Sequence, residues 1–521
     1  MPAVDQDHSA RRGIRFVVNL LWNWLGVAAT LVSGLLISPY LIRKLGPDGY
    51  GVWVISFSLV DNYALLDLGF RSATVKYVAH YWATGESTRV NEVLNTVIAY
   101  AGIVSLALFA VVLGGSAYVD RFFRVPPGYV HSFRMLVVIV SLSWCLGFVF
   151  NNFAASLEAV QRFDLFAKAG VTVTVFRVIG TAMLLYLGRD LVQIGILVVS
   201  SQILGYAIYF LAFRHIFPQL HLSVRHASLA TLKKMGSFGI HTFVLNIANL
   251  ILTQSPPLLI GHFLPASFAG YFSAPNRLLQ YSGEAVGRAG IITNANAAEL
   301  QARNDRSALP KLAIFTNRYS VVLFMSMAIS LWVFGDAIFN LWIPSIARFS
   351  TPLLRILLIG YVIAVAGQFS SSMLLQGLGR HQNYARGVMA EAIICIAALI
   401  WVIPRYGING VAWALTILMS VNRGLLTPWL VSREMKFSFP RFVASIYFLP
   451  FVSSIPAFAF ALLLKRTILP GQTWIQIFAV MAIIGVTYLG VALFLCVPPD
   501  HRRLLRSWMV QKLPWLRTAH A

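Results

Sequence analysis

Apolar residues occur along this chain in long unbroken runs, and the polar residues gather between the runs. Each run holds about 20 residues, the length that an α-helix needs to cross the hydrocarbon core of a bilayer. Strands of a membrane barrel would alternate apolar and polar residues, so the pattern favours helices. We therefore expect an all-α integral membrane protein with about 14 spanning helices, centred in residues 16–42, 51–70, 90–113, 132–155, 168–187, 191–213, 236–262, 268–293, 312–335, 351–376, 386–404, 408–431, 442–464 and 473–496.

The chain also contains an internal repeat. Moving the sequence by about 218 residues lays its second half on its first without a gap over roughly 130 residues. Repeated helical halves are typical of transporters that bind their substrate where the repeats meet. The matches reach beyond common apolar residues, since they pair Pro39 with Pro257, Pro47 with Pro265, Tyr63 with Tyr281, Gly69 with Gly287 and Arg162 with Arg380.

The repeat divides the chain into four parts. An N-terminal six-helix half covers residues 1–215, and a C-terminal six-helix half covers residues 216–436. Two additional helices occupy residues 437–497, outside the repeat, and residues 498–521 form a basic cytoplasmic tail. In this tail Arg502, Arg503 and Lys512 stand near apolar residues. That mixture is typical of a short helix on an anionic membrane surface, with a solvated basic tail as the alternative.

Charged residues are rare and mostly basic. They make up 11% of the chain, against about a quarter in soluble proteins, and the net charge is +23. When both termini are assigned to the cytoplasm, most lysines and arginines lie on that side, as the positive-inside rule requires. The net charge is therefore a topology signal, and we expect no nucleic-acid partner. Arg11, Arg12 and Arg15 precede the first helix without a cleavage site after it, so we expect an anchor rather than a signal peptide.

Motifs of catalysis are absent from the sequence. It contains no phosphate-binding GxxxxGK[ST] loop, no HExxH pair and no GxSxG nucleophile. Cys145, Cys395 and Cys496 are far apart within apolar runs, so we expect them to pack in helices and to bind no metal. The pattern favours transport over catalysis. Without a nucleotide site, the energy would come from a gradient or a partner, and we expect no cofactor beyond a proton or sodium gradient.

Several segments resemble one family. Residues 35–53 read LLISPYLIRKLGPDGYGVW, and the likeness continues in LLDLGF (65–70), KYVA (76–79), LLQGLGR (374–380) and YGINGVAW (406–413). These segments resemble the bacterial polysaccharide flippases, the Wzx-type oligosaccharide-lipid translocases of the multidrug/oligosaccharidyl-lipid/polysaccharide exporter superfamily. The resemblance covers about the first 430 residues.

The resemblance implies a function and a location. It implies flipping of an undecaprenyl-diphosphate-linked oligosaccharide from the cytoplasmic to the periplasmic leaflet of the bacterial inner membrane, for O-antigen, capsule or exopolysaccharide biosynthesis. The implied route is alternating access through a central cationic cavity, with both termini cytoplasmic. The implied partners are the lipid-linked oligosaccharide and membrane lipids, with the polysaccharide polymerase and the chain-length machinery as further candidates.

Three other functions stay open. Two belong to the same superfamily, a cation-coupled multidrug exporter and a peptidoglycan-precursor flippase, and the third is an integral glycan-modifying enzyme. An enzyme would need carboxylates at the outer face, where Asp48, Asp120 and Asp336 are scattered. A drug exporter would need an acid-dominated cavity. Here five arginines within predicted helices outnumber four acids, namely Arg177, Arg277, Arg288, Arg318 and Arg423 against Asp61, Asp67, Glu284 and Glu391.

The predicted helix 268–293 carries the clearest candidate site, formed by Arg277, Gln280, Tyr281, Glu284 and Arg288. At about 100° per residue, Arg277, Glu284 and Arg288 lie within roughly 40° of one another. Charge within the membrane is costly and faces a partner or water. Because the planar guanidinium can donate two parallel hydrogen bonds to a phosphate, we expect Arg277 and Arg288 to hold the diphosphate. An internal Arg–Glu pair that positions the helix is the alternative.

Polar stripes occur in equivalent helices of the two halves. In the first helix Asn19 and Asn23 begin such a stripe, and in the seventh Asn246 and Asn249 lie between Thr242 and Thr253 at the same spacing. Such stripes also mediate ordinary helix packing. Their presence in both halves favours a cavity in which asparagine side chains bind the hydroxyl groups of a glycan.

The remaining charges within predicted helices have separate expectations. Asp61 and Glu391 are candidates for coupling transport to an ion. Asp67 and Arg71 are four residues apart and are expected to pair with each other. Arg318 lies near a helix end, where its guanidinium would extend to the membrane surface.

The topology prediction places residues 43–50 and 114–131 outside. After the native cysteines are replaced, Asp48→Cys and Asp120→Cys should react with an impermeant thiol reagent in intact spheroplasts. Arg225→Cys should react only after the membrane is opened. Labelling of Arg225→Cys in intact spheroplasts, without labelling of Asp48→Cys, would invert the topology.

Overall fold

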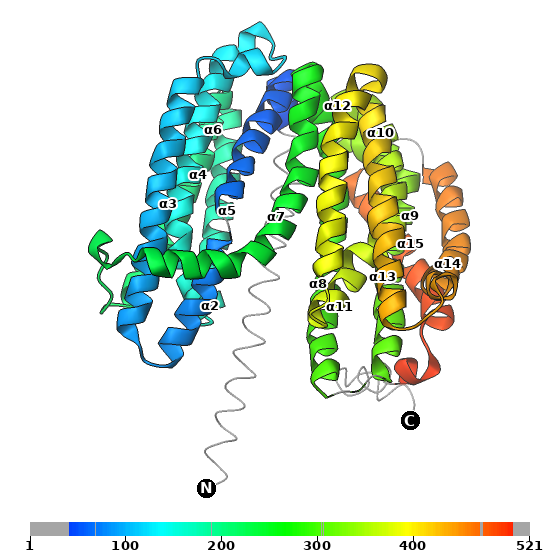
Figure 1. Ribbon diagram of the computed structural model, residues 1–521. Coiled ribbons are helices and arrows are strands. Elements are labelled where there is room, and N and C mark those ends of the chain that lie inside the picture. Colours follow the sequence, from blue (N-terminus) through cyan, green and yellow to red (C-terminus); the bar gives the residue numbers. More distant parts are fainter. Residues whose placement is uncertain are drawn as a thin grey trace, which may run out of the picture. The chain divides into compact units, whose positions relative to one another are not determined.

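The structure is a computed structural model, and it describes residues 41–67, 69–188, 190–303, 305, 307–468 and 473–503. Nearly all of these residues are helical and no strand occurs among them, which confirms the all-α prediction (Figure 1). Ten helices in the described ranges are long and apolar enough to span a membrane. One of them, Gln382–Glu434, holds 53 residues and is kinked at Gly407, so the count of 14 stays a prediction.

The chain forms two compact units, unit 1 (Met1–Ser273) and unit 2 (Ala274–Ala521). The boundary after Ser273 is set by contacts between residues. The boundary expected at residue 215 comes from the sequence repeat, and it stays a prediction. The described part of unit 1 contains helical residues 41–61, η1 (Asn62–Asp67), α2 (Phe70–Ala83), α3 (Ser87–Gly115), η2 (Val119–Phe122), η3 (Pro127–Tyr129), α4 (Val130–Ala159), α5 (Phe163–Tyr186), α6 (Leu191–Ile216), η4 (Val224–His226), α7 (Leu229–Phe263) and the start of α8 (Ala266–Ala302).

Unit 2 begins within α8 and is also helical. Two of its segments, η5 and η6, are π-helical turns inserted between α-helices. Its elements after α8 are α9 (Ala308–Trp342), α10 (Pro344–Val365), η5 (Ala366–Ser371), α11 (Ser372–Gly377), α12 (Gln382–Met419), η6 (Ser420–Leu426), α13 (Thr427–Glu434), α14 (Phe439–Ile468) and α15 (Trp474–Leu495).

Turns between the helices follow the local sequence. Gly46, between the predicted helices 16–42 and 51–70, has a φ of 73°, which interrupts the right-handed helix of residues 41–61. The tight turn between α5 and α6 ends in a capping box, in which the Asp190 side chain accepts from the helix and the Gln193 side chain accepts from the Asp190 backbone N–H at 2.9 Å. Gln161 and Gly379, which the repeat pairs, both have positive φ, 59° and 65°. This shared backbone feature supports the register of the repeat.

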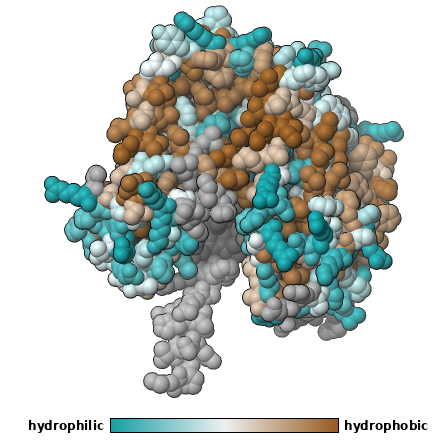
Figure 2. Space-filling model, viewed as in Figure 1, coloured by the Kyte–Doolittle hydropathy of each residue, from teal (hydrophilic) through white to brown (hydrophobic). Residues whose placement is uncertain are grey.

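Each unit packs around one central helix. In unit 1, α4 packs against α2, α3 and α6, and in unit 2, α9 packs against α10, α14 and α15. Large apolar side chains such as Ile103 and Leu106 of α3 are exposed. Figure 2 shows hydrophobic side chains over much of the visible surface, as expected for helices that face lipid. Because lipid is as apolar as leucine, close packing and polar contacts hold such helices together.

α7 is bent, and its two parts have different neighbours (Figure 1). Its first part packs against α2 and α3, and Ser228 caps its start by accepting a hydrogen bond from the backbone of Thr231. Its second part carries Asn246 and Leu250 beside the helical segment that ends in η1. The bend therefore lets α7 pack against α2 and α3 with its first part and line the interior of unit 1 with its second part.

The two helices after the repeat are fastened to α9 by cationic side chains. Arg318 of α9 donates from Nε to the Ser445 carbonyl at 2.8 Å and from Nη1 to the Cys496 carbonyl at 3.2 Å. Lys465 of α14 donates to the Val333 carbonyl at 2.8 Å and binds the Asp336 carboxylate at 2.7 Å. Arg318 was expected to extend to the membrane surface. Its guanidinium binds a carbonyl within α14 and the carbonyl at the C-terminal end of α15, and its position relative to the membrane surface stays a prediction.

The π-helical turns of unit 2 allow unusually close backbone packing. Gly367 in η5 lies against the backbone of Arg423 in η6, so that a methyl group on Gly367 would lie 1.6 Å from the Arg423 carbonyl oxygen. Such close approach of small residues is typical of membrane helix interfaces. The two turns can pack in this way only while position 367 has no side chain.

We therefore expect Gly367→Ala to destabilise the protein, because the added methyl forces two backbones apart at a cost of about 1–3 kcal/mol or more. A lower melting temperature in detergent and lower abundance in the membrane would show this. Gly102→Ala in α3 is the matched control, since nothing lies within 4 Å of its added methyl, and it should leave stability equal or higher by up to about 1 kcal/mol. Equal stability of the two variants would contradict the close packing.

Candidate functional site

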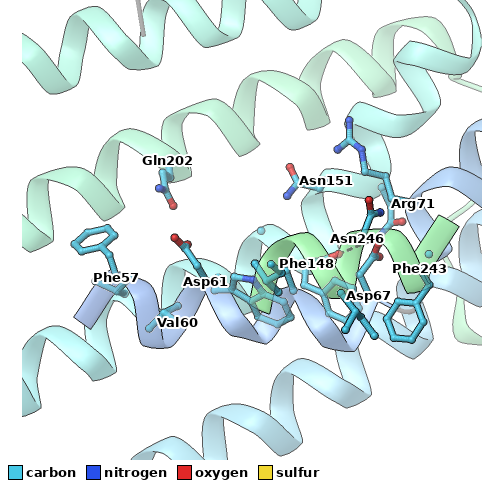
Figure 3. Close-up of a pocket in the computed structure, with 18 of the residues that line it drawn as sticks. Phe57, Val60, Asp61, Asp67, Arg71, Phe148, Asn151, Gln202, Phe243 and Asn246 are labelled. Carbon is cyan, nitrogen blue, oxygen red and sulfur yellow. Dashed lines mark hydrogen bonds between the residues drawn. The ribbon is translucent and has the colours of Figure 1, made fainter. Parts of the chain in front are cut away.

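A pocket lies among the helices of unit 1. It has a volume of about 450 Å³ and is formed by the end of the segment 41–61, η1, the start of α2, and parts of α4, α6 and α7 (Figure 3). The polar and aromatic side chains in its wall are Phe57, Asp61, Asp67, Arg71, Trp144, Phe148, Asn151, Asn152, Gln202, Tyr206, Phe243 and Asn246. Hydrogen-bonding groups and aromatic rings together are typical of pockets that bind polar organic molecules.

Asp61 brings a carboxylate into this pocket. Its Oδ2 accepts a hydrogen bond from Gln254 Nε2 of α7 at 3.1 Å, and the Asp61 and Gln202 side chains point into the same space in Figure 3. Asp61 is exposed and lines the pocket. It was expected to be an ion-coupling group, and that role stays a prediction. Within the described ranges, no cluster of three or more His, Cys, Asp or Glu side chains is placed to hold a metal.

Amide side chains line the pocket from three helices. Ser143 donates a hydrogen bond to Gln202 Oε1, which holds the Gln202 amide in place. Asn152 of α4 is buried and donates to the carbonyl of Phe148 at 2.9 Å, whereas Asn151 beside it faces the pocket (Figure 3). Asn246 of α7 is exposed and lines the same pocket. The predicted polar stripe of the seventh helix thus contributes Asn246 to a cavity.

Aromatic rings form the apolar part of the wall. The Trp144 and Phe148 rings are stacked, with centroids 5.0 Å apart, and the Tyr63 ring meets Trp144 edge-on at 5.7 Å. Contacts on several sides fix the plane of Trp144. A fixed indole beside amide groups can accept the apolar face of a ligand while the amides bind its polar edge.

Arg71 pairs across helices. Its Nη2 lies 2.8 Å from Glu158 Oε1 of α4. The guanidinium therefore forms its ion pair with Glu158. The expected partner Asp67 accepts a hydrogen bond from the Arg71 backbone N–H and interacts electrostatically with Arg71, so the expected pairing is confirmed in part. The positive charge at this end of the pocket is thereby matched by a carboxylate of the protein.

The predicted site on α8 belongs to unit 2. Arg277 and Glu284 are exposed, and Gln280 and Tyr281 are half-buried. Another face of α8 packs through glycines, since methyl groups on Gly283, Gly287 and Gly290 would lie 3.0–3.3 Å from Phe369 or Met373 atoms. Arg277 and Glu284 are thus exposed, and the role of the charged stripe in substrate binding stays a prediction.

Some predicted site residues have no described side chain. Asn19 and Asn23 lie outside the described residues, and so does the side chain of Arg288. Asn249 is described, and its Nδ2 donates to the Leu245 carbonyl of its own helix at 3.0 Å. The roles expected for these residues stay predictions.

Glu391 lies in a buried network of unit 2. Its Oε2 lies 3.1 Å from Arg423 Nε and 2.6 Å from Asn422 Nδ2, and the Glu391 and Arg423 side chains are only 4% and 9% exposed. Two donors and near-complete burial favour a structural role for this carboxylate. The network also engages Arg423, one of the five arginines that suggested a cationic cavity; Arg318 is likewise engaged, with helix carbonyls.

The repeat relates the pocket to a filled space in unit 2. The repeat pairs Gly69 with Gly287 and Asn151 with Phe369. In unit 1, Gly69 and Asn151 both line the pocket. In unit 2, the Phe369 ring lies directly on Gly287 and Gly283. The space that is a pocket in one unit is therefore occupied by an aromatic side chain at the equivalent place in the other.

Two carboxylates considered for an enzyme are engaged in ion pairs. Asp120 Oδ1 lies 2.8 Å from Arg134 Nε, and the adjacent guanidinium lowers the pKa of this carboxyl below its usual range. Asp120 is therefore ionised at neutral pH and unsuited to act as a general acid. Asp336 binds Lys465. Neither side chain is placed for glycan chemistry.

Sequence reasoning missed most of the pocket wall. Trp144, Gln202 and Tyr206 were not predicted as site residues. Asn151 and Asn152 could have been, because two adjacent amides within an apolar run are a signal that the sequence contains. Polar residues at such depth face a cavity or a protein partner. Which of these residues share a cavity depends on contacts between helices that are far apart in the sequence.

Comparisons with known proteins agree with the fold. A family model described as "Polysaccharide biosynthesis protein" matches residues 16–282, more than half of the chain. "Uncharacterized membrane protein EpsK" of Bacillus subtilis (strain 168) is 20% identical over 262 residues, and the match covers 50% of this chain and 52% of that protein. "Putative O-antigen transporter" of Shigella flexneri is 23% identical over 434 residues, covering 80% of this chain and 98% of that protein.

Solved structures show the same architecture. "Lipid II flippase MurJ, inward closed conformation" has a TM-score of 0.71 at 13% identity and covers 94% of this chain and 100% of its own. An inward-facing multidrug resistance transporter of the MATE family and MOP superfamily has a TM-score of 0.68 at 14% identity, covering 78% and 95%. At such identities the likeness shows the fold alone.

The buried network gives a test of structural against transport roles. Arg423→Met leaves Glu391 as a buried charge without its cation, which should cost about 3–5 kcal/mol and lower both melting temperature and abundance. Adding Glu391→Leu should restore much of the loss. The exposed pair Arg380–Glu434 is the control, and Arg380→Met should cost less than about 1 kcal/mol. A stable Arg423→Met variant, or a double variant no better than the single one, would contradict the structural role.

Proposed function

The chain belongs to the family of polysaccharide biosynthesis proteins, whose model matches more than half of it, and we propose that it flips a lipid-linked oligosaccharide across the bacterial inner membrane. The substrate in this proposal is an undecaprenyl-diphosphate-linked repeat unit that moves from the cytoplasmic to the periplasmic leaflet. The product then serves the biosynthesis of a surface polysaccharide such as O-antigen, capsule or exopolysaccharide. The pocket of unit 1 is the observation that carries the proposal.

The pocket fits the part of the substrate that cannot cross lipid. Moving a hydroxyl group from water to hydrocarbon without a hydrogen-bond partner costs about 4–8 kcal/mol of free energy. A glycan therefore needs hydrogen-bonding groups along its path. Asn151, Gln202 and Asn246 supply amides within the membrane-spanning helices, and Trp144 supplies an apolar surface. The polyprenyl tail is itself apolar and can stay in the lipid.

We assign the diphosphate to the charged stripe of α8. The side chain of Arg277 is exposed, and an arginine can bind a phosphate through two parallel hydrogen bonds. Arg288 shares this face by helical spacing. In the proposed cycle the cavity opens alternately to the two sides of the membrane, while Asn19, Asn23 and Asn249 contribute further contacts to the glycan.

A proton or sodium gradient is proposed to drive the cycle. Asp61 is the better of the two candidate coupling groups, because its carboxylate is exposed to the pocket, whereas Glu391 is buried between Asn422 and Arg423. The proposal places both termini in the cytoplasm. It also includes the polysaccharide polymerase and the chain-length machinery as partners that receive the flipped substrate.

Export of organic cations is the second candidate function. The described wall of the pocket contains two carboxylates, Asp61 and Asp67, and the one arginine there, Arg71, is bound to Glu158. An acidic, aromatic pocket also suits a hydrophobic cation. The family match and the amide-rich wall favour the glycan.

The proposed function predicts where the substrate accumulates. In a strain without the gene, the lipid-linked oligosaccharide should remain on the cytoplasmic leaflet and surface polymer should be lost. Asn151→Phe should have the same effect at normal abundance, because it fills the pocket with the side chain that occupies the equivalent place in unit 2. Leaflet location is measured by the access of a glycan-oxidising reagent to intact and opened spheroplasts.

The control is Ile103→Phe, which adds an aromatic ring to an exposed position of α3 and should leave export unchanged. Normal flipping by the Asn151→Phe variant would exclude the pocket as the substrate path. Normal surface polymer in the deletion strain, together with raised ethidium accumulation, would favour the exporter of organic cations instead.

A further inference from the structure

The loop between α3 and α4, residues 118–131, reaches across unit 1 to the turn between α7 and α8. We infer that this loop is a latch that holds the α7–α8 turn against the segment 41–61, and that it releases before the flipped glycan leaves on that side. The inference rests on the proposed function. The topology prediction places the loop outside the membrane, and every residue of the loop and the turn is described.

Three hydrogen bonds join the loop to the α7–α8 turn. The backbone N–H of Arg124 donates to the Gly261 carbonyl at 2.8 Å, and the Arg124 carbonyl accepts from the Ala266 backbone N–H at 3.2 Å. The His262 ring donates from Nδ1 to the Phe122 carbonyl at 2.6 Å. Gly261 lies in the last turn of α7 and Ala266 begins α8, where backbone groups have no partner within their own helix. The loop therefore supplies the partners that these two helix ends lack.

A second set of contacts holds the loop on α4. The Asp120 carboxylate lies 2.8 Å from Arg134 Nε. The Phe123 ring meets the fully buried Phe133 ring edge-on, with centroids 5.7 Å apart. The chain also continues from the loop directly into α4. The loop is thus fixed at α4 by an ion pair, by ring packing and by the chain itself.

The turn that the loop holds lies directly on the segment 41–61. A methyl group on Gly51 would lie 2.0 Å from the Ala266 carbonyl oxygen, so the two backbones are in contact. The repeat pairs Pro47 with Pro265, which makes the contacting turns counterparts from the two repeated halves. A substrate that moves between repeated halves has to part these turns when it leaves on their side of the membrane.

The attachment to the turn is the one that can release. Phe122, Arg124 and His262 are all exposed, so water can replace the hydrogen bonds of the loop at a small net cost. Exposed segments of this kind open locally while the core stays folded. The loop can therefore leave the turn while Asp120 and Phe123 keep their contacts with α4. The two turns can then part without the unfolding of a helix.

Reversible cross-linking tests the inference. In a chain whose native cysteines are replaced, Phe122→Cys and His262→Cys are joined by a short bis-methanethiosulfonate, and dithiothreitol later cleaves the link. In spheroplasts of the deletion strain, an impermeant glycan-oxidising reagent measures how much newly labelled lipid-linked oligosaccharide reaches the outer leaflet. Joining should lower the flipping rate at least about tenfold, because a latch that cannot open stops release, and dithiothreitol should restore it.

Asp120→Cys with Arg134→Cys is the matched control, because it joins the same loop to α4 with the same reagent. Joining this pair should leave flipping unchanged. Full flipping by the joined Phe122→Cys/His262→Cys protein, or failure of that pair to join, would overturn the inference and leave the proposed function intact. Equal loss of flipping in the joined control would also overturn it. If the unjoined proteins reach normal abundance and do not flip, the proposed function fails, and the inference fails with it.

Hydrogen exchange measures the latch without a substrate. Exchange in peptides that contain Arg124 or Ala266, followed by mass spectrometry in lipid nanodiscs, should be at least about threefold faster in His262→Ala, which loses the bond to the Phe122 carbonyl. His262→Asn is the conservative comparison, since its side-chain amide can also donate, and it should exchange as the wild type does. Equal exchange in His262→Ala and the wild type would show that the ring does not hold the loop, and would overturn the inference.

Discussion

Hydrocarbon provides no hydrogen bonds, so every polar group within the span of this protein must find its partner in the protein or in a cavity. This constraint explains most of the contacts described above. Arg318 binds helix carbonyls, Lys465 binds a carbonyl and a carboxylate, and Arg423 binds Glu391. The amides and carboxylates of the unit 1 pocket differ from these side chains, because they meet the requirement by facing a cavity as well as by binding protein groups. The wall of the pocket is thus built from polar groups that helix packing leaves available.

The helices and the repeat could be predicted from the sequence because both are periodic or local signals. Runs of apolar residues marked the spans, and Gln161 and Gly379, which the repeat pairs, share a positive φ. Contacts within the site were harder to predict. Asp67 and Arg71 were expected to pair because they are neighbours on a helix, yet Arg71 binds Glu158, 87 residues away. Nothing in the spacing of Arg71 indicates which side chain of α4 it meets.

The predicted cationic character of the cavity illustrates the same limit. Counting arginines within helices treated each as available to a ligand, but Arg318 and Arg423 are engaged with the protein. The stripe on α8 was predicted from the sequence because its residues share one face of one helix, and its role stays a prediction. The pocket of unit 1 could not be predicted, because its wall is drawn from segments between residues 57 and 250. A site assembled across helices is visible only when their packing is known.

The contrast between Asn151 and Phe369 has an evolutionary consequence. A duplicated chain begins with two copies of every space between its helices, and each copy is exposed to the same selection. Once an aromatic ring fills one of the two copies of a space, that half no longer needs to fit a ligand there. Selection can then act on the rigidity of that half alone. A new ligand can then be accommodated by substitutions in a single half. The ring of Phe369 thereby confines adaptation to one part of the chain and protects the packing of the other.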